Sequence, residues 1–292
     1  MSTATEVATT EQPAAKEQPT TAELLVELRL TTDAVRGKAW LSGEITGSTA
    51  TLSALGSTEN PLTGLSGAGL DWLMPMVSFL EEPLNQLRGN PDPVAAGADG
   101  FDGAGRDTAT VADDYRRSTT EETDEWAGEA ADGYRAAGAQ QADGLAALGE
   151  ASTTVASAVA GAGEVVAQVV DIVTRLVAEA VGKIVPIMTQ AVAAAPATFG
   201  QSIVAAIPQC VGIAVDYGQR ILGKLAALLA SGDNLLKLVD AALAVLDLVK
   251  QVLTPIGQQS TQPEQQQTTQ PEDQQTTEPD DQPSTDREEE LV

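Results

Sequence analysis

The chain has no histidine and a single cysteine, Cys210, among its 292 residues. Without histidine, neither a Ser-His-Asp triad nor a Cys-His pair can be assembled within it. One cysteine also excludes an intrachain disulfide and the usual cysteine and histidine zinc sites. Because Cys210 lies in an apolar run, we expect a small buried side chain and not a nucleophile. We therefore expect no catalytic, cofactor-binding or metal-binding residues, and no enzyme activity.

Aromatic and basic residues are also scarce. Aromatic residues make up 3% of the chain, so alanine, valine and leucine must supply the core. Such a core suits close helix contacts and not a β-sandwich, and we predict an all-α fold. With 42 acidic and 16 basic residues the net charge is -26, which repels nucleic-acid phosphates and excludes nucleic acid as a partner. This excess of acidic residues is typical of a protein from a salt-loving host, where high ionic strength screens the repulsion between them. It could equally serve ordinary solubility.

A corner formed by Trp126-Ala127-Gly128 separates two long amphipathic segments. In both segments the seam positions recur at alternating three- and four-residue steps, which is typical of helices. They are Phe101, Ala104, Thr108, Val111 and Tyr115 before the corner, and Tyr134, Gly138, Gln141, Leu145, Leu148, Ser152, Val155 and Val159 after it. We predict that the two seams pack on each other in an elongated helical hairpin. The first helix should run from Pro93, capped by Asp92, to Arg117, and the second from Gly128 to Lys183 and beyond.

The string Asp-Glu-Trp-Ala-Gly-Glu-Ala-Ala-Asp-Gly-Tyr-Arg-Ala, which begins at Asp124, resembles the WXG superfamily. These proteins are small helical-hairpin substrates of type VII (ESX) secretion in actinobacteria and related Gram-positive bacteria. The resemblance covers residues 70–185. It implies a non-enzymatic secretion substrate or secretion-associated protein that acts through helix-helix pairing, with a homo- or hetero-oligomeric helical partner and the type VII machinery. The candidate recognition and pairing residues are Trp126, Gly128, Tyr134, Phe101 and Tyr115. Trp126 is expected either to anchor a partner or to plug the end of the hairpin.

The amino end lacks the basic and apolar regions of a secretory signal peptide. The resemblance accordingly implies a leaderless route from the cytoplasm to the cell envelope or medium. The type VII signal, Tyr-x-x-x-Asp/Glu after the hairpin, is not matched, because the three tyrosines are followed four residues later by Thr119, Gly138 and Ile221. Either a partner carries the signal, or the protein is a structural relative that is not secreted.

The remaining segments complete the expected domain organisation. Residues 1–21 and the acidic, Gln/Thr/Pro-rich residues 254–292 are predicted to be disordered tails. Residues 22–69 are expected to form a short helix, residues 22–36, and a flexible connector. Residues 186–253 are predicted to be a hydrophobic helical region that ends in an antiparallel hairpin, with helices at 211–230 and 234–253 on either side of Ser231-Gly232-Asp233.

Residues 184–215 carry no charge, and their length would allow a membrane span. Three prolines, Pro186, Pro196 and Pro208, are expected to cut this stretch into short pieces that pack in the core. Contact with a membrane through residues 184–215 stays open. It gives an alternative function, a membrane-active or channel-like helical module. A second alternative is a cytoplasmic helical scaffold or adaptor.

Overall fold

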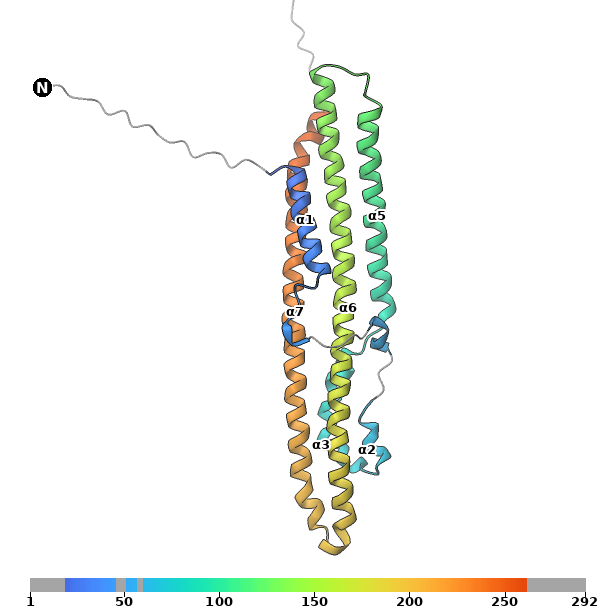
Figure 1. Ribbon diagram of the computed structural model, residues 1–292, viewed down its shortest axis with the longest axis vertical. Helices are drawn as coiled ribbons and strands as arrows, with labels where there is room; N and C mark the ends of the chain where they lie inside the picture. The colour runs from blue at the N-terminus through green and yellow to red at the C-terminus, as the bar shows by residue number, and fades with distance from the viewer. Residues whose placement is uncertain (1–18, 46–50, 57–59, 262–292) are drawn as a thin grey trace, which may run out of the picture.

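Two very long helices, α6 (Glu129–Thr198) and α7 (Gln201–Thr261), lie side by side along the whole molecule (Figure 1). The computed structural model describes residues 19–45, 51–56 and 60–261, and no residue in these ranges lies in a β-strand. Two shorter helices, α1 (Thr21–Arg36) and α5 (Pro91–Glu121), flank one half of the long pair. The predicted all-α, elongated bundle is therefore confirmed.

Helix α1 begins one residue before its predicted start, because Thr20 and Glu23 form a capping box. The Thr20 hydroxyl accepts a hydrogen bond from the Glu23 backbone N–H, and the Glu23 carboxylate accepts one from the Thr20 backbone N–H. The Thr20 backbone N–H and, secondly, the Thr20 hydroxyl donate to the Glu23 carboxylate at 2.8 and 3.0 Å and hold the pKa of this carboxyl below its ordinary value. Leu24, Leu25 and Leu28 on the inner face are buried against small residues of α6 and α7. Helix α1 therefore fills one of the two grooves between the long helices.

The predicted flexible connector after α1 is wrong for the residues that the structure describes. Trp40 is buried, and its indole N–H donates to the Val35 carbonyl at 3.1 Å. The Ser42 backbone N–H donates to the buried Ser231 hydroxyl of α7 at 2.9 Å. Leucines at 55, 62 and 65 are also buried, so hydrophobic burial orders a segment whose glycine and serine content indicated a loop.

Short helical turns follow and cover the other half of the α6–α7 pair (Figure 1). Leu73, Val77, Leu80 and Leu84 of these turns are fully buried in the main core with α6 and α7, and Leu52 and Leu87 are half-buried against it. The elements are η1 (Gly43–Ile45), η2 (Leu52–Gly56), α2 (Thr63–Gly67), η3 (Asp71–Leu73), α3 (Met74–Val77), η4 (Ser78–Leu80) and α4 (Glu82–Leu87).

Helix α5 starts two residues earlier than predicted. The cap is Asn90, whose side chain accepts from the Asp92 backbone N–H at 3.0 Å, and Pro91 takes the first helical position. Both Asn-Pro at 90–91 and Asp-Pro at 92–93 offer an N-cap residue followed by a proline at the first helical position. The helix starts at the upstream pair. The helix then continues through the predicted end at Arg117 to Glu121.

Neither long helix is broken where the sequence predicted a break. Pro186 and Pro196 lie inside α6, and Pro208 and Pro255 lie inside α7. All four prolines are exposed, so solvent can reach the carbonyls that lose their helical partners. The predicted hairpin at Ser231-Gly232-Asp233 is also wrong, because α7 passes straight through it. Ser231 is buried and bonds the segment after α1.

The turn between α6 and α7 consists of Phe199 and Gly200, both in the left-handed region with φ of 51° and 85°. The Thr198 and Ser202 hydroxyls bond to each other across this turn at 2.9 Å. The predicted domain boundaries at 185/186 and 253/254 therefore fall inside continuous helices. Residues 254–261 are helical, and the rest of both expected tails lies outside the described residues.

Candidate helix-pairing site

The corner between α5 and α6 depends on a glycine. Gly128 has φ 97° and ψ 173°, a conformation that is essentially restricted to glycine. It stands at the N-cap of α6, and its carbonyl accepts from the backbone N–H groups of Ala131 and Asp132. A Cβ at this position would meet no neighbouring atom within 4 Å, so backbone geometry and not space requires the glycine.

Arg135 holds the turn from the first part of α6. Its guanidinium donates to the backbone carbonyls of Thr123 and Trp126, the latter at 2.9 Å. Its Nε donates to the Thr123 hydroxyl at 3.1 Å, and that hydroxyl donates to the Thr119 carbonyl at 2.6 Å. One planar side chain thus bonds two carbonyls of the turn that follows α5. The backbone around Trp126 is therefore fixed before any partner binds.

Trp126 and Tyr134 form an aromatic pair on the outside of this corner. Their ring centroids lie 5.6 Å apart at an interplanar angle of 46°. Trp126 is 54% exposed, so it does not plug the end of the hairpin. A large, half-exposed aromatic side chain on a fixed backbone has the properties of a binding anchor.

On α5 the contact with α6 uses different residues from the predicted seam, whereas Gly138 of the predicted α6 seam takes part in it. The buried positions of α5 are spaced by seven and are Ala98, Gly105, Ala112 and Thr119. A Cβ on Gly105 would lie 2.8 Å from the Gly149 carbonyl oxygen, and one on Gly138 would lie 2.7 Å from Thr119 Cγ2. The two backbones therefore approach closely through glycines. The predicted seam of α5 is wrong, since Phe101 and Val111 are exposed.

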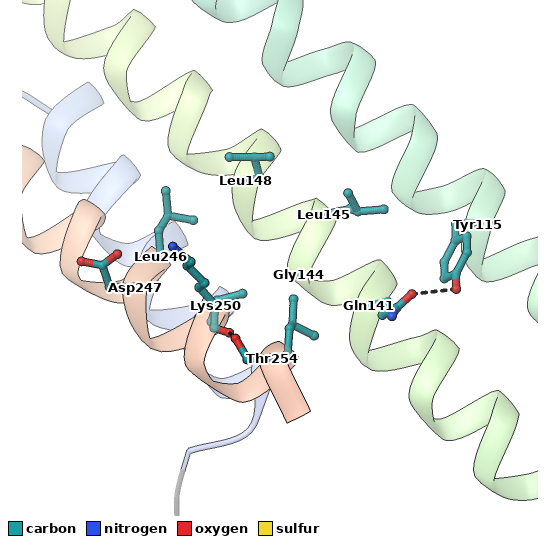
Figure 2. A pocket seen from close by; sticks show the side chains of 11 residues that line it. Tyr115, Gln141, Gly144, Leu145, Leu148, Leu246, Asp247, Lys250 and Thr254 are labelled. Atoms are coloured by element: carbon teal, nitrogen blue, oxygen red, sulfur yellow. Dashed lines mark hydrogen bonds between the residues drawn. The ribbon is translucent and has the colours of Figure 1, made fainter. Parts of the chain in front are cut away.

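Some residues of the predicted seams, Tyr115 on α5 and Gln141, Leu145 and Leu148 on α6, border an open groove beside this contact (Figure 2). The groove has a volume of about 580 Å³. Tyr115 stands on its α5 side and donates its hydroxyl hydrogen to the Gln141 carbonyl oxygen at 2.8 Å. Leu145 and Leu148 of α6 form the floor, and Leu246, Lys250 and Leu253 of α7 form the other side. We call this hollow the α5–α7 groove.

The five predicted site residues are therefore divided between three places. Trp126, Gly128 and Tyr134 come together at the corner. Tyr115 lines the α5–α7 groove, and Phe101, 47% exposed, lies on α5 away from the corner. Sequence reasoning missed the role of Arg135. The available signal was an arginine in the second turn of α6, from which a long side chain can reach back to the carbonyls of the turn before the helix.

Other chemistry-bearing features are few in the described ranges. Cys210 is fully buried, and burial raises the pKa of its thiol. Across residues 19–45, 51–56 and 60–261, no cluster of three or more cysteine, aspartate or glutamate side chains is arranged to hold a metal ion. In the same ranges, no helix combines the length and the apolar character that crossing a bilayer requires.

Comparison of the chain with protein-family models, with curated proteins and with solved structures found no match in any of the three.

Proposed function

We propose that this protein is a non-enzymatic substrate, or a secretion-associated protein, of a type VII secretion system, and that it acts through helix-helix pairing. The observation that carries the proposal is the Trp126-Ala127-Gly128 corner between two long antiparallel helices. The tryptophan of this tripeptide is half exposed, and its glycine has a backbone conformation that other residues rarely adopt.

Preorganisation supports a role for the corner in recognition. Arg135 bonds two carbonyls within the turn, those of Thr123 and Trp126, so a partner would not have to order this loop on binding. Tyr134 packs beside the indole, and about half of Trp126 stays exposed. A helical partner could bury this anchor.

The same proposal gives the location and the partner. The protein would leave the cytoplasm and reach the cell envelope or the medium. Because no tyrosine is followed four residues later by Asp or Glu, a helical partner would supply the export signal.

Immunoblotting of culture filtrate, envelope and cytosol from the native host tests this proposal. We expect the protein outside the cytosol in the parent strain and its retention when the type VII ATPase is deleted. Trp126→Ala should reduce export, whereas Trp72→Ala, a control with a comparably exposed indole outside the corner, should not. Retention in the cytosol with and without the ATPase would contradict the proposal.

A second candidate function, contact with a membrane surface, is favoured by the tip of the α6–α7 hairpin. Phe199 at this tip is 96% exposed, and no charged residue occurs between residues 184 and 215. An uncharged tip with a protruding aromatic ring could enter the interfacial region of a bilayer. Flotation with neutral phosphatidylcholine vesicles tests this: Phe199→Asp should abolish co-flotation and Leu30→Asp on α1 should not. Absence of flotation of the unchanged protein would remove this candidate.

A further inference from the structure

A continuous strip of side chains runs along α6 from the corner into the α5–α7 groove. Tyr134, Gln141, Leu145 and Leu148 follow one another at steps of seven, four and three residues, so they share one face of the helix. Trp126 packs on Tyr134 at the corner end of this face. At 1.5 Å per residue, Tyr134 and Leu148 lie about 21 Å apart along α6. We call these five residues the pairing strip.

The pairing strip is open to solvent although most of it is apolar. Trp126, Tyr134 and Leu148 are 54%, 48% and 49% exposed. Figure 2 shows Leu145 and Leu148 on α6, with α7 on one side and Tyr115 of α5 on the other. A trough between two roughly parallel helices has the shape that receives a third helix. An amphipathic helix of about 14 residues would cover the pairing strip.

The corner end of the pairing strip is strongly acidic. Residues 121–132 contain six exposed carboxylates and no basic residue. The carboxylates belong to Glu121, Glu122, Asp124, Glu125, Glu129 and Asp132. Among the described residues, only Asp132 of this set forms an ion pair, with Arg135 at 3.4 Å. The Arg135 guanidinium is also engaged by the carbonyls of Thr123 and Trp126. The exposed aromatic pair therefore stands in a surplus of negative charge.

We infer that the pairing strip binds an amphipathic helix of a different protein, whose lysine or arginine residues lie at the end that reaches the corner. This inference rests on the proposed function, since it names the chemistry of the helical partner. The acidic corner attracts such a helix before contact is made. On contact, a guanidinium or ammonium group can stack on the exposed indole of Trp126.

Charge also distinguishes this partner from the other occupants of the pairing strip. Residues 262–292 of the chain itself include ten acidic residues and one basic residue, and a second copy would bring its own acidic corner. Each of these would set like charges beside one another.

Within the α5–α7 groove the charges balance, because Lys250 and Asp247 both line it. The groove itself therefore selects apolar side chains, and the corner selects the basic ones. The expected partner helix has apolar residues at three- and four-residue steps and a basic terminal half.

Calorimetric titration of the purified full chain with synthetic peptides tests the inference, at physiological salt where exposed charges are screened beyond about 8 Å. The first peptide, of about 18 residues, has leucines at three- and four-residue steps and arginines in one terminal half. A second peptide has glutamate in place of each arginine, and a third keeps the composition but moves the leucines out of the helical period. We expect the first to bind in the micromolar range and the other two at least about 10-fold more weakly.

Variants of the protein locate the bound peptide. Trp126→Ala and Leu148→Asp should each weaken binding of the arginine peptide at least about 10-fold. Trp72→Ala and Leu30→Asp are the matched controls, since these side chains are 42% and 66% exposed and lie outside the pairing strip. Neither control should change the dissociation constant. Circular dichroism would verify that each variant remains helical.

The charge contribution has its own variant. Asp124→Asn combined with Glu125→Gln should slow association of the arginine peptide and make the rate less dependent on salt, as stopped-flow fluorescence would measure. An unchanged association rate would overturn the role given to the acidic corner.

Three results would overturn the inference as a whole. The arginine peptide does not bind; or the glutamate or off-period peptide binds equally well; or the affinity survives both Trp126→Ala and Leu148→Asp, because the peptide is then held elsewhere on the acidic surface. Export is a separate readout. Retention of the protein in the cytosol would remove the secretion proposal and leave peptide binding in place, whereas failed peptide binding would leave ATPase-dependent export in place.

Discussion

The backbone contact between α5 and α6 predicts that Gly149→Ala destabilises the protein, although alanine is the better helix former. Gly149 is buried in the middle of the contact. A Cβ there would lie 2.8 Å from the Gly105 carbonyl oxygen and 3.2 Å from the Ala109 backbone nitrogen. Both neighbours are backbone atoms, so neither can rotate away. The two helices would have to separate.

The expected magnitude follows from two opposing effects. Replacing a glycine by alanine in a helix interior stabilises by about 1 kcal/mol. Inserting a methyl group into a packed contact costs about 1–3 kcal/mol. We therefore expect Gly149→Ala to lower the free energy of unfolding by about 1 kcal/mol. Gly182→Ala on the same helix is the matched control, because a Cβ at Gly182 meets nothing within 4 Å. This control should stabilise by about 1 kcal/mol.

Thermal and urea unfolding, followed by far-UV circular dichroism at one protein concentration, would measure this difference. A gap of about 2 kcal/mol between the two variants corresponds to melting temperatures about 4–8 °C apart. If Gly149→Ala were as stabilising as Gly182→Ala, the close approach of α5 and α6 at Gly105 and Gly149 would be refuted.

Three further predictions concern the corner and the core. Arg135→Lys should lower the free energy of unfolding by about 1 kcal/mol in urea titration, because a lysine cannot bond the carbonyls of Thr123 and Trp126 together; an unchanged midpoint would contradict this. Gly128→Ala should cost about 1–3 kcal/mol through its positive φ, and equal stability of the two proteins would show that the turn relaxes. Cys210 should react with iodoacetamide far more slowly in the native protein than in denaturant, since burial raises its pKa and blocks access; equal rates would place it outside the core.

Local rules predicted the helical class and the start of α1 well. The start of α1 depends on a capping box that is visible as Thr20 followed by Glu23. The corner at Trp126 was also predictable, because Gly128 stands where the apolar period is interrupted. At the start of α5, two competing Asx-Pro pairs made the boundary ambiguous by two residues.

The breaks at proline and at Ser231-Gly232-Asp233 were predicted and are wrong for one reason. A proline or a glycine weakens a helix locally by about 1–3 kcal/mol, which is decisive for an isolated helix. Helices α6 and α7 instead bury apolar residues against each other over most of their length. That burial outweighs each local penalty, so the two helices continue.

For the candidate site, the sequence identified the residues at the corner but not their support. Trp126, Gly128 and Tyr134 were found from the tripeptide and its continuation. The bonds from Arg135 could not be derived, because they depend on the angle at which α6 leaves the turn. Among the four glycines near the start of α5, only Gly105 contacts α6, and a Cβ at Gly97, Gly100 or Gly103 would meet nothing within 4 Å.

The sequence by itself determined that the chain is helical, where its first helix begins and which residues share each helix face. Those features depend on interactions within a few residues of one another and on the helical period. The tertiary structure alone decided which face is buried. Helix α7 has two adjacent seven-residue repeats of apolar residues, and only the position of α6 and α1 selects the one that contains Ile221 and leaves Leu222 exposed. Periodicity fixes the spacing of a seam, whereas the neighbours that cover it come from distant parts of the chain.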